Sequence, residues 1–119
     1  MRLYAKAIPF SLTSSEPQEK PVISTNRMVK IETIEIFTDV KRKKIGIWRL
    51  SEFPYMVAIK ENGITKGVID CMSEGALSGY KVDFAEPLRL TGEVSLVVQA
   101  NVEKGKEFNV MVHISMVEI

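Results

Sequence analysis

The chain has 119 residues and a mass of 13.4 kDa, which is the size of a single domain. Its 16 Lys and Arg residues nearly balance 15 Asp and Glu residues, and the formal net charge of +1 excludes an overall field that attracts nucleic acid or acidic membrane. The hydrophobic fraction of 45% is that of a folded protein and excludes intrinsic disorder.

The apolar composition favours β-structure. There are 13 Val and 12 Ile residues against 7 Leu and 6 Ala, and β-branched side chains pack well on pleated sheets but lose rotamer freedom in helices. Lys and Glu are enriched and Asn and Gln are scarce, which is the compositional trend of proteins from hyperthermophiles. We therefore expect an all-β protein, and the composition indicates a thermophilic source.

The sequence pattern of residues 1–25 predicts a strand, a loop and a second strand. Residues 2–8 alternate and predict a strand that ends at Pro9. Residues 13–21 form the most polar stretch and predict a loop. That loop makes residues 1–12 a possible N-terminal arm, which could pack on its own subunit or cross to another. Residues 22–25 are a short apolar strand.

Residues 28–38 fit neither strand nor helix periodicity cleanly. The β-branched residues Val29, Ile31, Ile34 and Ile36 favour a strand with a bulge, and a helix is the alternative. Residues 45–50 follow as a further predicted strand.

A hairpin is the strongest local signal in the chain. The predicted strands 55–60 and 64–72 flank Asn62-Gly63, and both residues of such a turn tolerate a positive φ. Strands are also expected over residues 80–84 with 88–90, over 94–100 and over 108–116, where the apolar positions alternate.

About eight strands at roughly ten-residue spacing predict one sandwich domain over residues 1–119. We expect a single antiparallel β-sandwich of jelly-roll type, with an immunoglobulin-like sandwich or a small barrel as alternatives.

The chain has one His and one Cys, which leaves little room for catalysis. His113 lies in the middle of a strand without a second imidazole for a metal site. Cys71 lies on a different predicted strand and lacks a local activating motif. We expect no catalytic, cofactor-binding or metal-binding residue, and no enzymatic activity; an enzyme using Cys71 or His113 is the weakest hypothesis.

A basic run is the one local charge feature. Lys41, Arg42, Lys43 and Lys44 are a possible anion contact, but in a chain of near-zero net charge a solvated turn is the favoured interpretation. We do not expect nucleic acid as a partner.

Apolar residues on strand faces that are otherwise polar predict an interface. In the first strand Tyr4 and Ile8 oppose Leu3, Ala5 and Ala7, which we assign to the core. The possible interface residues are Tyr4, Ile8, Val97, Met111 and Val117.

These observations favour a non-enzymatic structural subunit that self-associates or binds other structural subunits, most specifically a virion coat or decoration protein. The alternative is a monomeric ligand-binding or carbohydrate-binding module that uses Trp48, Tyr55 or Tyr80. The first residues lack the apolar core of a signal peptide, and no segment has the length and hydropathy of a membrane span. We therefore expect synthesis in the cytoplasm, and location in the virion if the assembly hypothesis holds.

Overall fold

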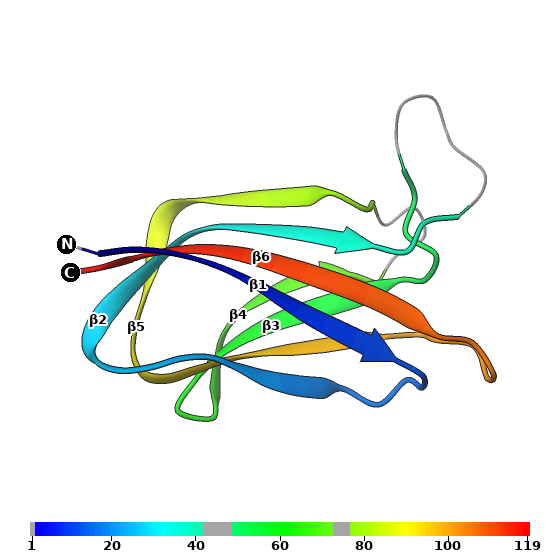
Figure 1. The fold of residues 1–119 in the computed structure, drawn as a ribbon, viewed down its shortest axis with the longest axis horizontal. Coiled ribbons are helices and arrows are strands. Elements are labelled where there is room, and N and C mark those ends of the chain that lie inside the picture. Colours follow the sequence, from blue (N-terminus) through cyan, green and yellow to red (C-terminus); the bar gives the residue numbers. More distant parts are fainter. Residues whose placement is uncertain (1, 42–48, 73–76) are drawn as a thin grey trace.

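The computed structural model describes residues 2–41, 49–72 and 77–119, and these parts of the chain form an all-β fold without helices. The described strands are β1 (Arg2–Leu12), β2 (Gln18–Thr38), β3 (Tyr55–Glu61), β4 (Ile64–Cys71), β5 (Tyr80–Ala100) and β6 (Phe108–Glu118) (Figure 1). All pairings between them are antiparallel, in the order β1-β6-β2-β5-β3-β4.

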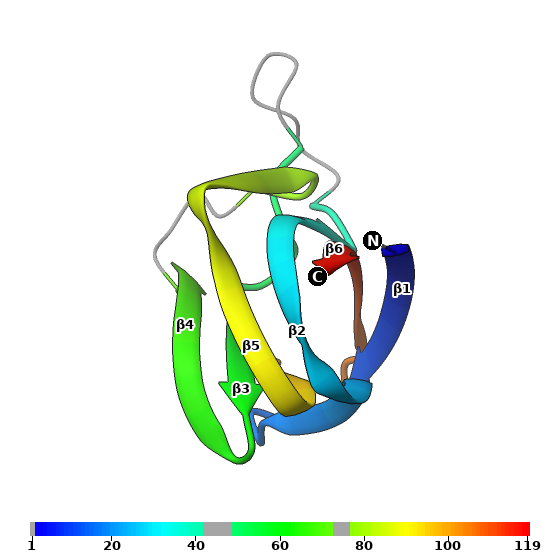
Figure 2. The ribbon, with the colours of Figure 1, turned by 90° about the vertical axis from the view of Figure 1, so that its left-hand side faces the viewer.

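The two longest strands, β2 and β5, bend together. They pair along their whole lengths, with register shifts between Pro21 and Ile23, between Thr25 and Val29, and between Ile31 and Thr33. Figure 2 shows the two strands curving side by side through the bend. At the last two shifts, residues 26–28 of β2 and 84–87 of β5 have no partner on the other strand. Irregularities of this kind bend paired strands sharply, so each long strand can contribute to two different faces.

The bend divides the hydrogen-bonded sheet into two four-stranded faces. The first sheet contains β1, β6, residues 29–38 of β2 and residues 80–90 of β5. The second sheet contains residues 18–25 of β2, residues 94–100 of β5, β3 and β4. Two four-stranded sheets connected in this order form a jelly roll, so the predicted fold class is confirmed.

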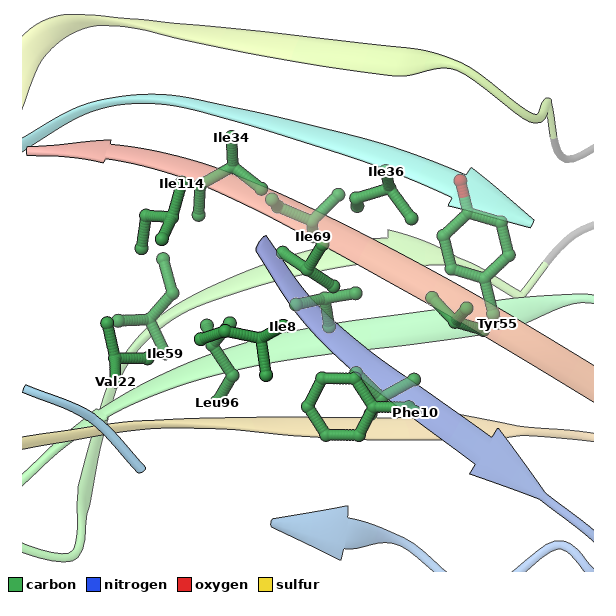
Figure 3. Close-up of a cluster of buried hydrophobic side chains, with 14 of the residues drawn as sticks. Ile8, Phe10, Val22, Ile34, Ile36, Tyr55, Ile59, Ile69, Leu96 and Ile114 are labelled. Carbon is green, nitrogen blue, oxygen red and sulfur yellow. The ribbon is translucent and has the colours of Figure 1, made fainter. Parts of the chain in front are cut away.

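The core lies between the inner faces of these two sheets (Figure 3). Ile34 and Ile114 of the first sheet and Ile59 and Leu96 of the second are almost completely buried and belong to one apolar cluster. Burial of apolar surface at about 25 cal/mol per Å² is the main force that holds two such sheets together. No buried side-chain nitrogen or oxygen of the described residues lacks a hydrogen-bond partner.

The strands are fewer and longer than the sequence predicted. Residues 22–25 and 28–38 are parts of β2, and residues 80–84, 88–90 and 94–100 are parts of β5, because the backbone pairing continues through each bend. The segment 28–38 is strand, as the β-branched residues indicated, and not helix.

Two predicted boundaries at the start of the chain were wrong. The first strand continues beyond Pro9 to Leu12, since β1 is an edge strand and a proline there removes no sheet hydrogen bond. The polar loop expected over 13–21 is shorter, because β2 begins at Gln18 and pairs with β5. The strand predicted over 45–50 lies mostly outside the described residues.

The hairpin at Asn62-Gly63 is confirmed, and it also supports the bend of β5. Both turn residues have positive φ, 48° and 81°. The Asn62 side chain accepts a hydrogen bond from the backbone N–H of Glu93 at 2.9 Å and donates one to the carbonyl of Thr91 at 3.3 Å. Gly92, with φ of 94°, lies between those two residues.

Replacement of Gly92 by alanine tests this support. A Cβ at Gly92 would lie 2.5 Å from Asn62 Oδ1, so Gly92→Ala adds a clash to the cost of a positive φ, and we expect the unfolding free energy to fall by about 2–3 kcal/mol. Gly105 has a similar φ of 82°, but a Cβ at that position would have no atom within 4 Å. Gly105→Ala should therefore lower the unfolding free energy by only about 1 kcal/mol. Equal losses for the two variants in urea unfolding would show that close packing of Asn62 against Gly92 adds nothing to the cost.

Candidate assembly surface

The outer face of the first sheet carries an apolar region at the end away from the bend. Pro9 of β1 pairs with Met111 of β6, and Met111 pairs with Phe37 of β2, so the three side chains form one row. Met111 is half-buried and Phe37 is exposed. The Phe37 ring lies 5.1 Å from the ring of His113 on the same face. The structure therefore places Met111, a predicted interface residue, on an outer surface.

At the bend end of the same face, Leu3 pairs with Val117. Leu3 is 78% exposed and Val117 is 8% exposed. Val117 is therefore covered within its own chain and offers little surface to a neighbour, contrary to the sequence prediction. Leu3, which the sequence analysis assigned to the core, is the exposed apolar residue here.

The faces of β1 are the reverse of those predicted. Ile8 is buried in the core together with Phe10 and Leu12, and Tyr4 is half-buried against the core with its hydroxyl donating to Glu118. Leu3 and the two alanines between it and Pro9 face outward. This face of β1 turns to the core because Ile8, Phe10 and Leu12 bury far more apolar surface than Leu3 and the two alanines would. The prediction ended the strand at Pro9 and so missed two of these three residues.

The outer face of the second sheet holds Val97, the remaining predicted interface residue. Val97 pairs with Ala58 of β3, and Ala58 pairs with Val68 of β4. Val97 is half-buried, and Val68 is 53% exposed. These three residues form an apolar row, called here the Val68 row, which ends at the outer edge of β4.

The edges on one side of the sandwich are protected. Here the free edge of β1 faces the first half of β2, where Lys6 Nζ donates to the carbonyl of Val22 and Lys20 Nζ donates to the carbonyl of Pro9. Prolines and lysines on edge strands prevent pairing with further strands. Pro9 and Pro21 add to this protection because neither has an N–H to offer.

The two remaining edges differ from each other. Residues 80–90 of β5 include Pro87, and the pairing with β2 slips between Asp83 and Leu88, so this edge is interrupted. Strand β4 has no proline, and its apolar residues Ile64 and Val68 are 61% and 53% exposed. Of the four edges formed by the described strands, that of β4 is the one open to strand addition.

The basic run lies largely outside the described residues. Lys41 is exposed just after β2, and its backbone N–H donates to the carbonyl of Leu50 at 2.9 Å. Arg42, Lys43 and Lys44 are not among the residues that the structure describes. Their predicted anion contact stays a prediction.

The structure does not bring Cys71 and His113 together. Cys71 ends β4 in the second sheet, and His113 lies on β6 in the first sheet, where it is exposed beside Phe37 on the outer face. Burial raises the pKa of the Cys71 thiol above its ordinary value, and the neighbouring Tyr55 hydroxyl offsets part of that rise. A raised pKa lowers the thiolate fraction and so disfavours nucleophilic chemistry.

Histidine, cysteine and carboxylate groups do not cluster in the described parts of the chain in a way that could hold a metal ion. Over the same residues, no helix is long and apolar enough to span a membrane. An open groove of about 1060 Å³ lies beside the first half of β2 and is lined by Lys6, Glu19 and Glu93 among others.

The aromatic residues expected to bind carbohydrate do not form a common surface. Tyr55 is fully buried, so its predicted exposure was wrong. Its hydroxyl donates to the carbonyl of Leu77 at 2.8 Å, and burial raises its pKa. Tyr80 is 41% exposed at the start of β5. Trp48 is outside the described residues.

Comparisons with known proteins indicate the fold. No family model and no curated protein sequence matches the chain. A solved structure described as the cyanophage Pam1 capsid asymmetric unit contains a chain with a similar fold, at a TM-score of 0.55 and 9% sequence identity. The match covers 97% of this chain and 82% of that chain. The shared fold extends over nearly the whole of this protein.

Removal of one hydroxyl group tests the structural role of Tyr55. Tyr55→Phe leaves the Leu77 carbonyl without its donor, so the unfolding free energy should fall by about 1–2 kcal/mol. Tyr80→Phe, at an exposed tyrosine, should change it by less than about 0.5 kcal/mol. A larger loss for Tyr80→Phe than for Tyr55→Phe in urea unfolding would contradict the assignment.

Proposed function

We propose that this protein is a non-enzymatic structural subunit that assembles with copies of itself, as a virion coat or decoration protein. The observation that carries the proposal is a jelly roll that occupies the described chain and resembles a chain of a cyanophage capsid asymmetric unit along 97% of its length. A fold by itself does not determine function, so the surfaces must supply the rest of the argument.

The surfaces support assembly through more than one contact. The first sheet exposes Leu3 and Phe37, and the second exposes Val68 beside the open edge of β4. These residues lie on different faces of the sandwich. Exposed apolar groups on separate faces suit a subunit with several neighbours.

The two residues best suited to nucleophilic chemistry support a non-enzymatic role. Cys71 lies in the second sheet and His113 on the outer face of the first, and the pKa of Cys71 is raised. A thiol needs a base within hydrogen-bond reach to act as a nucleophile at neutral pH. We therefore assign both side chains to the fold rather than to a reaction.

Mass measurement in solution tests the proposal. Light scattering of the purified protein over a range of micromolar concentrations should give a mass above 13.4 kDa that rises with concentration, because apolar contacts between subunits follow mass action. Negative-stain electron microscopy at the highest concentration should show oligomers of regular symmetry. A mass of one subunit at every concentration would contradict the proposal.

A further inference from the structure

The far edge of β4 is free to accept another strand. Among the described strands, β4 pairs with β3 alone. Its sequence over residues 64–71 carries no proline, in contrast to the other three edges. An open edge presents unpaired backbone N–H and C=O groups that can bond to a further strand.

The hydrogen bonds at both ends of β3 show which β4 groups are free. The Pro54 carbonyl accepts from Asn101 N–H at 3.2 Å, and Asn62 N–H donates to the Glu93 carbonyl at 2.8 Å. Backbone groups of successive residues in a strand point to opposite neighbours. The even-numbered residues of β3 therefore bond toward β5, and the odd-numbered residues bond toward β4.

The same alternation continues across the hairpin. Odd-numbered Val57 pairs with Ile69, so the backbone groups of Ile69 point toward β3. The N–H and C=O groups of Val68 and Asp70 therefore point into the open edge. Their side chains lie on the outer face, opposite in direction to the buried Ile69. The alternation ends at Lys66, which lies in a bulge between the pairs Ile59–Gly67 and Lys60–Thr65.

We propose that β4 pairs antiparallel with β4 of a second copy of this chain, about a two-fold axis at Val68. This inference rests on the proposed function and names one of its contacts. With the axis at Val68, that residue faces Val68 of the second copy. Its free N–H donates to the Val68 carbonyl there, and its carbonyl accepts from the Val68 N–H of the second copy. A two-fold axis requires this self-complementarity of the interface.

The apolar side chains favour this axis. The Val68 row, with Ala58 and Val97, continues across the axis into the same row of the second copy. The two Val68 side chains, each 53% exposed in the single chain, then cover each other as a cross-strand pair.

Cysteine crosslinking tests the position of the axis. In a Cys71→Ser background, Val68→Cys should form a disulfide-linked dimer on mild oxidation, because directly opposite residues in a hydrogen-bonded pair have Cα atoms about 5.5 Å apart, within disulfide range. Ile64→Cys is the matched control. It is more exposed than Val68, but the register places the two copies of residue 64 about 27 Å apart. It should therefore crosslink far less.

A charge at the axis tests its position independently. Val68→Asp should weaken dimerisation about tenfold or more in sedimentation equilibrium, because it places two like charges directly opposite each other. Ile64→Asp, far from the axis, should weaken it much less. Circular dichroism confirms folding of each variant.

Two sets of results would overturn the inference. Equal crosslinking of Val68→Cys and Ile64→Cys, or unchanged dimer affinity in Val68→Asp, would exclude this axis while the wild-type protein still forms oligomers, and the proposed function would stand. A wild-type protein that stays monomeric at all concentrations would overturn both the proposed function and this contact.

Discussion

The common bend of β2 and β5 is the feature on which the rest of the structure depends. Both strands change sheets at the same place and are paired on both sides of the register shifts, so one continuous six-stranded sheet encloses the core. Asn62, from the β3–β4 turn, bonds to the backbone on both sides of Gly92 and supports this bend from outside. The bend also determines the edges, because two four-stranded sheets have four edge strands. Three of these are interrupted or protected by prolines, and the fourth is β4.

Much of the fold could be predicted from the sequence because the signals are local. Alternating apolar residues identify β6, and Asn62-Gly63 identifies the β3–β4 hairpin. The β-branched residues of 28–38 favoured strand, and the structure agrees. The bends were not predicted, because a bend within one long strand has the same local sequence pattern as a turn between two short strands. Pro9 similarly suggests a strand end, and its tolerance depends on an edge position that tertiary pairing creates.

The candidate surface was harder to predict than the fold, because exposure depends on neighbours in space. Ile8 and Val117 interrupt a simple alternation, which suggested an outer interface, but Ile8 lies in the core and Val117 is covered within the chain. Val97 and Met111 lie on outer faces as expected. Neither Val68 nor Leu3 was among the predicted interface residues, since the importance of Val68 follows from the strand order and that of Leu3 from the inverted faces of β1.

Amide hydrogen exchange measured at low and high protein concentration tests the central claim, assembly through the open edge, most directly. Exchange at Val68 and Asp70 should slow as the mass rises, because their N–H groups become hydrogen-bonded to a second copy. Residues along the free edges of β1 and of the proline-containing part of β5 should show no comparable change. An increase in mass with no slowing at Val68 and Asp70 would contradict assembly through this edge.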